Sequence, residues 1–411
     1  MTVAFAAARS TAPDYPRPQV LALAPLEGPR APGWRRKSDS SEALVKGLLL
    51  CASLASAAAS ASRQQRPAQQ QQRRLGRRQR SRVRRSAGAG VELPELAIGT
   101  WAWGNRLLWQ YTPEMDDDLR RAFELCVERG ACFFDTGDTY GTGDLDGRSE
   151  SLLGQFDAGL PAPLPWPLPS PRRPILATKW APKVWMLSRE SLVESCKRSI
   201  GRMGRVDVGQ LHWPPAFFHE SQLLDGLGDV YEQGLVKGVG LSNYGPQGLQ
   251  GVVNRLAERG VPVATAQVQF SLLTENNDAF VETCLELGVK PIAYSPLCLG
   301  LLSGKYNEEG ATLPPPPRGW LLGALSGDAN FKRLLGVLDE IGKGRGKTRA
   351  QVAINWCVCK GAMPLVGVKN VIQAEENLGA IGWRLSDNEV LELDRASRAA
   401  PKTQPNPVSV P

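Results

Sequence analysis

The sequence is poor in residues that bind metals. It contains only two histidines, His212 and His219, and none of its eight cysteines stand in a C-x-x-C pair. Structural zinc sites need clusters of such ligands at short spacings, so we expect no metal site. Most of the cysteines lie in apolar runs such as GACFFD and INWCVC, which favours buried, reduced thiols over a disulfide framework.

Two common catalytic or binding signatures are also missing. Gly238-Val239-Gly240 is not followed by a third glycine at the spacing of a dinucleotide-binding fingerprint. No set of serine, histidine and aspartate indicates a nucleophilic triad. The sequence therefore offers neither a Rossmann-type cofactor site nor a hydrolase of the triad type.

An excess of basic residues is lacking in most of the chain, although the net charge is +8. Residues 1–90 hold 17 Lys and Arg against 4 Asp and Glu, a balance of +13, which leaves 32 against 37, or −5, for the remainder. A nucleic-acid-binding domain needs its basic residues on the folded part. We therefore expect no nucleic-acid partner.

The N-terminal residues 1–88 lack the patterns of a folded domain. They are rich in Arg and Ser and poor in acidic residues, which is typical of an organellar transit peptide and favours a plastid destination. Residues 43–61 form an apolar run diluted by Ala and Ser, so a secretory or lumenal signal and a mitochondrial destination stay open. The run is too short and too dilute for an integral membrane span.

From Val91 onward, short apolar runs alternate with amphipathic stretches. The apolar runs predict buried strands within 96–103, 132–140, 174–180, 206–213, 236–244, 264–273, 289–297 and 362–368. Helical patterns cover 116–129, 148–156, 188–203, 221–234, 246–259, 277–288, two segments within 329–360, and 370–381. This alternation predicts an α/β fold, a (β/α)₈ TIM barrel over residues 89–400 followed by a Pro-rich tail, 401–411. A doubly wound open sheet is the alternative.

Two Pro-rich stretches are longer than the loops that a minimal barrel needs. Residues 157–174 precede the third strand, and we interpret them as a surface loop on the side away from the strand ends. Residues 298–328, which include LPPPPRGW, follow the seventh strand on the side where barrel active sites form. The second stretch is therefore a candidate lid or pocket wall.

Polar residues close the apolar strands one after another. They are Asp135 and Tyr140, Lys179, His212, Ser242 and Asn243, Gln267, and Tyr294 and Ser295. Strand ends of a parallel barrel open on one face, so these side chains should converge there.

Four of these residues suit proton donation to a carbonyl oxygen. A tyrosine has a reference pKa of about 10, and a nearby ammonium makes its proton easier to release. An aspartate beside the lysine keeps that ammonium charged and oriented, and a histidine can donate a hydrogen bond to a substrate oxygen. Asp135, Tyr140, Lys179 and His212 together therefore indicate general acid chemistry.

The motifs DTGDTYG, ATKW, LHW, LSNY, QVQFS, AYSPL and GVKNVIQAEENL occur in this order over residues 92–397. In these motifs the chain resembles the aldo-keto reductase family, and within it a plastid-type member. The resemblance implies an NADPH-dependent aldo-keto reductase, an alcohol dehydrogenase of the NADP⁺ type. It also implies that Asp135, Tyr140, Lys179 and His212 are the catalytic residues, with Tyr140 as the proton donor.

The resemblance further implies that NADP(H) binds across the barrel mouth. Its nicotinamide would contact Ser242, Asn243, Gln267 and Tyr294, and its pyrophosphate Ser295, Leu297, Gly300 and Lys305. Its adenosine end would contact Gly367, Lys369, Gln373, Glu376 and Asn377. Lys369 is a suitable cation for a 2′-phosphate, whereas NAD would favour an acid there.

The substrate is less defined. Trp103 and Trp213 follow strands and are candidates for an apolar pocket that suits an aromatic or apolar carbonyl compound. Members of this type act on pyridoxal, reactive aldehydes and sugars, and the sequence does not choose among them. A monomer is favoured over an oligomer. The alternatives are an NADPH-binding regulatory or sensor module with little turnover, and an unrelated phosphate-binding barrel enzyme.

Overall fold

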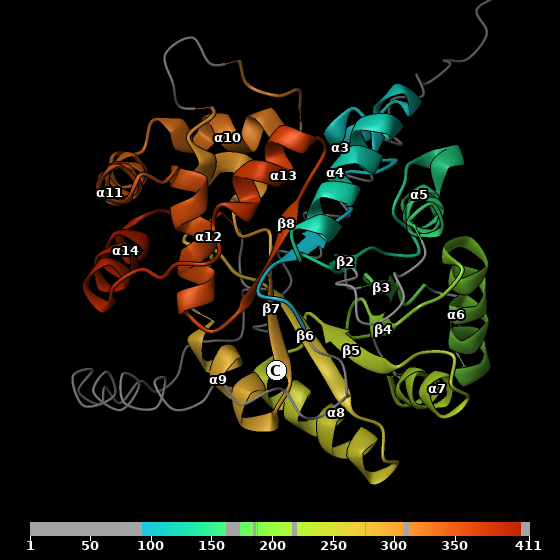
Figure 1. Ribbon diagram of the computed structural model, residues 1–411. Helices are drawn as coiled ribbons and strands as arrows, with labels where there is room; N and C mark the ends of the chain where they lie inside the picture. Colours follow the sequence, from blue (N-terminus) through green and yellow to red (C-terminus); the bar gives the residue numbers. More distant parts are fainter. Residues whose placement is uncertain are drawn as a thin grey trace, which may run out of the picture. The chain divides into compact units, whose positions relative to one another are not determined.

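Eight parallel strands close into a barrel in chain order in the computed structural model (Figure 1), which confirms the predicted (β/α)₈ fold over the open sheet. The structure describes residues 93–161, 173–183, 186, 188–215, 220–275, 277–306, 312–316 and 318–403. The strands are β1 (Ala97–Gly99), β2 (Phe133–Asp135), β3 (Ile175–Trp180), β4 (Val208–Leu211), β5 (Gly238–Ser242), β6 (Val263–Gln269), β7 (Lys290–Tyr294) and β8 (Met363–Gly367). Each lies within the apolar run that predicts it, apart from the start of β6, one residue earlier.

The predicted helices lie around the outside of the barrel (Figure 1). They are α4 (Asp116–Glu128), α5 (Arg148–Ala158), α6 (Arg189–Met203), α7 (Glu220–Glu232), α8 (Pro246–Glu258), α9 (Asp278–Leu287), α11 (Ala329–Arg345), α12 (Arg349–Cys359) and α13 (Val371–Leu378). Capping boxes at Ser188 and Thr348 fix where α6 and α12 begin, because each hydroxyl accepts from a backbone N–H of the first turn.

Three α-helices of the described residues were not among those predicted. A short helix, α3 (Arg106–Trp109), follows β1, and α10 (Arg318–Ser326) lies in the stretch after β7. The last helix, α14 (Asp387–Ala399), begins at a capping box on Ser386 and is joined to α11 by an ion pair between Glu389 and Arg345. Sequence reasoning stopped at the end of the barrel repeat and so missed α14.

Several predictions fall on residues outside those described. They are the targeting segment 1–88, most of the Pro-rich stretch 157–174, parts of 298–328, His219, and residues 404–411 of the tail. Among the helices that the structure describes, none combines the length and the apolar character needed to cross a bilayer.

The inside of the barrel changes from apolar to polar along the strands. Residues two apart on a strand face the same side, and the interior cluster includes Phe133, Ala177 and Val208. Two residues further on, the same three strands carry Asp135, Lys179 and Gln210, which are all buried. The barrel interior is thus apolar further from the carboxyl ends of these strands, and it supports the buried polar groups at those ends.

Candidate active site

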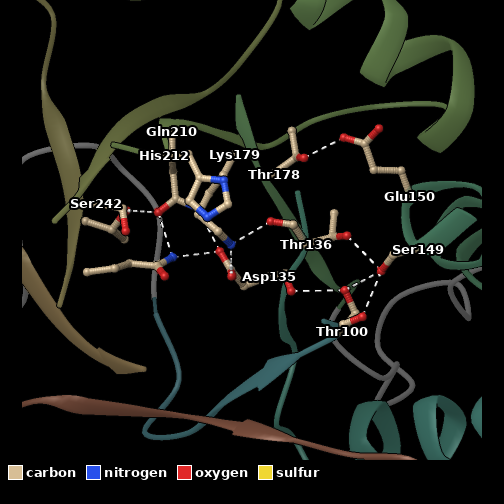
Figure 2. A network of polar contacts seen from close by, with 12 residues as sticks. Thr100, Asp135, Thr136, Ser149, Glu150, Thr178, Lys179, Gln210, His212 and Ser242 are labelled. Carbon is tan, nitrogen blue, oxygen red and sulfur yellow. Dashed lines mark hydrogen bonds and ion pairs between the residues drawn. The ribbon is translucent and has the colours of Figure 1, made fainter. Parts of the chain in front are cut away.

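Asp135 and Lys179 form a buried ion pair at the carboxyl ends of β2 and β3 (Figure 2). The side chain of Lys179 is 3% exposed, and its Nζ donates to Asp135 Oδ2 and, at 2.6 Å, to the carbonyl of Thr136. Burial works against the ammonium, but Asp135 and Tyr140 outweigh it and raise the pKa of Lys179. Lys179 is therefore a fixed positive charge inside the barrel mouth.

Two glutamines complete the hydrogen bonding of the Asp135 carboxylate. Its Oδ1 accepts from Gln210 Nε2 at 2.8 Å and from Gln267 Nε2 at 2.6 Å. Gln267 also donates to Gln210 Oε1, at 2.8 Å, so the three side chains hold one another. Gln267 thus orients Asp135 in this structure, in addition to the predicted contact with a nicotinamide.

Sequence reasoning missed Gln210. It lies two residues before His212, and the period-two alternation of a strand directs both positions to the same side. The signal available in the sequence is an amide within an apolar run. Such a run predicts a buried strand, and a buried amide, as Gln210 proves to be, needs a polar partner.

A second buried network fixes the carbonyl that accepts from Lys179. The hydroxyl of Thr136 donates to Ser149 Oγ at 2.9 Å, and Ser149 Oγ donates to Thr100 Oγ1 at 2.7 Å (Figure 2). These hydroxyls join β1, β2 and the start of α5. The backbone next to Asp135 is therefore held from three elements.

Tyr140 lies in the loop after β2, above the ion pair. The Nζ of Lys179 is 5.0 Å from the centroid of the Tyr140 ring. Burial raises the pKa of Tyr140 and the charge of Lys179 opposes that rise. A Cβ at Gly137 would stand 3.0 Å from a carbon of this ring, so a larger residue at that position would crowd Tyr140. The phenol is therefore protonated at neutral pH and adjacent to a cation.

His212 follows β4 and faces Tyr140. The two ring centroids are 5.8 Å apart with the planes 68° apart, and the ring of Trp213 stacks with the imidazole at a centroid distance of 5.9 Å. Burial, together with the charge of Lys179, lowers the pKa of His212 to about 3. Its Nδ1 is buried and has no partner among the described protein groups. His212 is thus a neutral hydrogen-bonding group in the mouth.

The low pKa of His212 predicts a pH-dependent contribution to stability. Its pKa is depressed in the folded state, so the unfolded chain binds the extra proton below the ordinary value of 6.5. The unfolding free energy should then fall as pH drops from 6.5 toward 3, by up to about 1.4 kcal/mol per pH unit from this group. Denaturant unfolding of His212→Asn across this range should show a shallower fall than wild type. Parallel curves for the two proteins would contradict the assignment.

Residues predicted for the nicotinamide lie at the ends of β5 and β7. The Tyr294 hydroxyl donates to Asn243 Oδ1 at 2.8 Å, and Asn243 Nδ2 donates to the His212 carbonyl at 3.0 Å and to Ser242 Oγ at 3.1 Å. Asn243 has a φ of 65°, a left-handed conformation that asparagine tolerates better than most residues. These contacts bring three of the predicted residues next to His212.

The remaining predicted cofactor residues lie in the segment after β7 and in the stretch from the end of β8 into α13. Ser295, Leu297, Gly300 and Lys305 share the first segment, in which Ser295 and Gly300 have φ values of 53° and 95°. In the second, the backbone N–H of Lys369 donates to Gln373 Oε1 at 3.0 Å, and Asn377 Nδ2 donates to the Gly367 carbonyl at 3.3 Å. Glu376 lies on α13, between Gln373 and Asn377 in the sequence.

The two predicted pocket tryptophans have different environments. Trp213 is 43% exposed and borders His212. Trp103 is fully buried, packs edge-on against Phe156 and donates its indole N–H to the Val368 carbonyl at 2.9 Å. Trp103 therefore has no exposed surface in this structure, and its predicted pocket role stays a prediction.

Comparison with known proteins identifies the family of the chain. Residues 95–398 match the model of the aldo/keto reductase family. A chloroplastic pyridoxal reductase of Arabidopsis thaliana is 46% identical over 323 residues, which cover 76% of this chain and 86% of that protein. The L-glyceraldehyde 3-phosphate reductase of Escherichia coli K12 is 27% identical over 75% of this chain and 90% of its own length.

Solved structures share the fold. The glycerol dehydrogenase of Gluconobacter oxydans superposes with a TM-score of 0.62 at 22% identity, covering 77% of this chain and 95% of that protein. An aldo-keto reductase of Bombyx mori, solved in complex with NADP, gives a TM-score of 0.54 at 21% identity over 75% and 90% of the two chains.

Proposed function

Because the chain belongs to the aldo/keto reductase family, we propose that it is an NADPH-dependent oxidoreductase that reduces an aldehyde or ketone to an alcohol. The observation that supports this most directly is the placement of Tyr140. Its ring lies beside the buried ammonium of Lys179 and faces the neutral imidazole of His212. This is a proton donor with a cation and a hydrogen-bonding group around it, at the mouth of a barrel.

Each of these residues has a distinct part in the proposed reaction. Tyr140 donates its phenolic proton to the substrate carbonyl oxygen, and Lys179 stabilises the phenolate that remains. Asp135 keeps Lys179 charged and in place. His212, being neutral, can donate one hydrogen bond to the carbonyl oxygen and so orient it. NADPH, when bound, would supply the hydride for the carbonyl carbon.

The residues present suit this cofactor. The buried Nδ1 of His212 has no described protein partner. The backbone carbonyl of the same residue accepts from Asn243, which belongs to a polar cluster with Ser242 and Tyr294 that could hold a carboxamide. The face of Tyr294 suits stacking on a planar ring. Ser295, Leu297, Gly300 and Lys305 would contact the pyrophosphate, and the segment from Gly367 to Asn377 the adenosine end.

Lys369→Glu tests the proposed 2′-phosphate contact. A hydrogen bond to a charged group contributes about 1.5–3 kcal/mol, so the dissociation constant for NADPH should rise by about 10- to 100-fold. NADH lacks the phosphate, and its dissociation constant should change much less. Titration of both nucleotides by their fluorescence measures this. An equal loss of affinity for NADPH and NADH would show that Lys369 does not contact the 2′-phosphate.

We further propose an aromatic aldehyde as the substrate, with pyridoxal as the first compound to test. The exposed ring of Trp213 lies next to His212, where it can cover a planar substrate. The relative that shares 46% identity is a pyridoxal reductase. Small sugar-like aldehydes are the alternative, because a glyceraldehyde 3-phosphate reductase is also a relative.

The test is steady-state oxidation of NADPH by the purified full chain, with pyridoxal, benzaldehyde and L-glyceraldehyde 3-phosphate as substrates and NADH in parallel. Turnover with NADPH preferred supports the proposed reductase. Tight NADPH binding with no turnover on a broad aldehyde panel would instead favour a sensor module. Failure to bind either nucleotide would contradict the proposed function.

We propose that residues 1–88 direct the protein to plastids and that residues 89–400 form the catalytic unit, which acts as a monomer. The chloroplastic relative and the Arg- and Ser-rich composition support the destination. A fluorescent reporter fused behind residues 1–88 should enter chloroplasts in leaf cells. Mitochondrial or secretory labelling would contradict this.

A further inference from the structure

The segment between β1 and α4 is attached to two other loops of the barrel mouth. On one side, the backbone N–H of Arg106 donates to Thr142 Oγ1 at 3.0 Å, and the Arg106 guanidinium pairs with Asp144 at 3.0 Å. Both partners lie in the loop after β2 that also carries Tyr140. Asn105 caps α3 by accepting from the N–H of Leu108, so this short helix has a defined start.

On its other side, the segment is attached to the end of β8 through Trp103. The indole N–H of this fully buried side chain donates to the Val368 carbonyl at 2.9 Å, across 265 positions of sequence. Val368 immediately precedes Lys369. The hydrogen bond therefore fixes the backbone from which the Lys369 side chain extends.

A second tryptophan of the segment lies against Lys369 itself. The Nζ of Lys369 is 5.7 Å from the ring centroid of Trp109, within the range of a cation–π contact. Trp109 is in turn supported by Trp101, whose ring meets it edge-on at 6.0 Å and 78°. The ammonium thus has an aromatic surface that restricts where it can point.

We infer that Trp103 and Trp109 position Lys369 for the 2′-phosphate of the cofactor and so help to set the preference for NADPH over NADH. They are positioning residues, since they act through Lys369. The inference rests on the proposed function. It gives Trp103, which has no exposed surface, and α3 a part in cofactor selection.

Two substitutions in the full chain separate the two contacts. Trp109→Leu removes the ring, and a cation–π contact at a partly exposed site contributes about 0.5–1 kcal/mol, so NADPH should bind about 2- to 5-fold more weakly. Trp103→Phe keeps an aromatic ring but loses the donor to Val368, which should weaken NADPH by about 5-fold. NADH binding should be nearly unchanged in both. Leu107→Ala, an exposed site on the same α3, is the matched control.

A double-mutant cycle distinguishes positioning from a general loss of structure. In a Lys369→Met background, Trp109→Leu should have no further effect on NADPH affinity, because the contact that it removes is already lost. Nucleotide fluorescence gives the dissociation constants, and thermal melting checks that each variant is folded.

Any of three results would overturn the inference. The first is wild-type NADPH affinity in both tryptophan variants, and the second is an equal loss of NADPH and NADH binding. The third is an undiminished effect of Trp109→Leu in the Lys369→Met background. A wild-type protein that binds neither nucleotide would instead contradict the proposed function, and the inference with it.

Discussion

Tyr140→Phe should reduce aldehyde reduction with NADPH by about 10²- to 10⁴-fold, the usual contribution of a general acid. The phenyl ring can keep its place over Gly137 and beside Lys179, so the pocket should retain its shape. The dissociation constant for NADPH should stay close to that of wild type. Steady-state rates and nucleotide fluorescence on the same preparation measure the two quantities.

The matched control is Tyr231→Phe, which removes a hydroxyl from α7 on the outside of the barrel. It should leave the rate of reduction unchanged. If the Tyr140→Phe enzyme still reduced aldehydes at a rate comparable to wild type, Tyr140 would not be the proton donor. His212 would then be the next residue to consider, although its neutral imidazole is a weaker candidate.

The raised pKa of Tyr140 also fixes the sign of the pH dependence. A general acid works in its protonated form, so reduction should persist through neutral and mildly alkaline pH and fall only as the phenol ionises. The reverse reaction requires the phenolate and should rise with pH in the same range.

The barrel could be predicted because the sequence repeats the alternation of an apolar strand with an amphipathic helix. Runs such as CFFD and PILATK are apolar and bounded by polar residues, and their number and spacing leave few other folds. Convergence of Asp135, Lys179 and His212 followed from topology alone, since the strand ends of a parallel barrel meet on one face. No tertiary detail was needed for that step.

The directions of individual side chains could not be predicted in the same way. Trp103 and Trp213 each follow a strand, yet the structure buries the first and exposes the second. Whether an indole turns inward depends on a distant acceptor, here the Val368 carbonyl, which adjacent sequence does not reveal. The same holds for Gln267, whose amide donates to Asp135, 132 positions earlier in the chain.

Lys179→Met should abolish reduction and also destabilise the fold, which Tyr140→Phe should not. The substitution leaves the Asp135 carboxylate buried without its cation, and breaking one side of a buried pair costs about 3–5 kcal/mol. Gln210 and Gln267 would still donate to Asp135 Oδ1, so the folded state should persist with a lower unfolding free energy. Denaturant unfolding measures that loss.

The double variant Asp135→Asn/Lys179→Met separates the structural and the catalytic parts of this effect. Removing both charges takes away the uncompensated carboxylate, so the double variant should regain much of the stability that Lys179→Met loses. It should remain inactive, because no ammonium is left to stabilise the Tyr140 phenolate. A double variant that regained activity along with stability would show that Lys179 serves only the fold. A Lys179→Met protein as stable as wild type would show that the ion pair between Lys179 and Asp135 does not stabilise the fold.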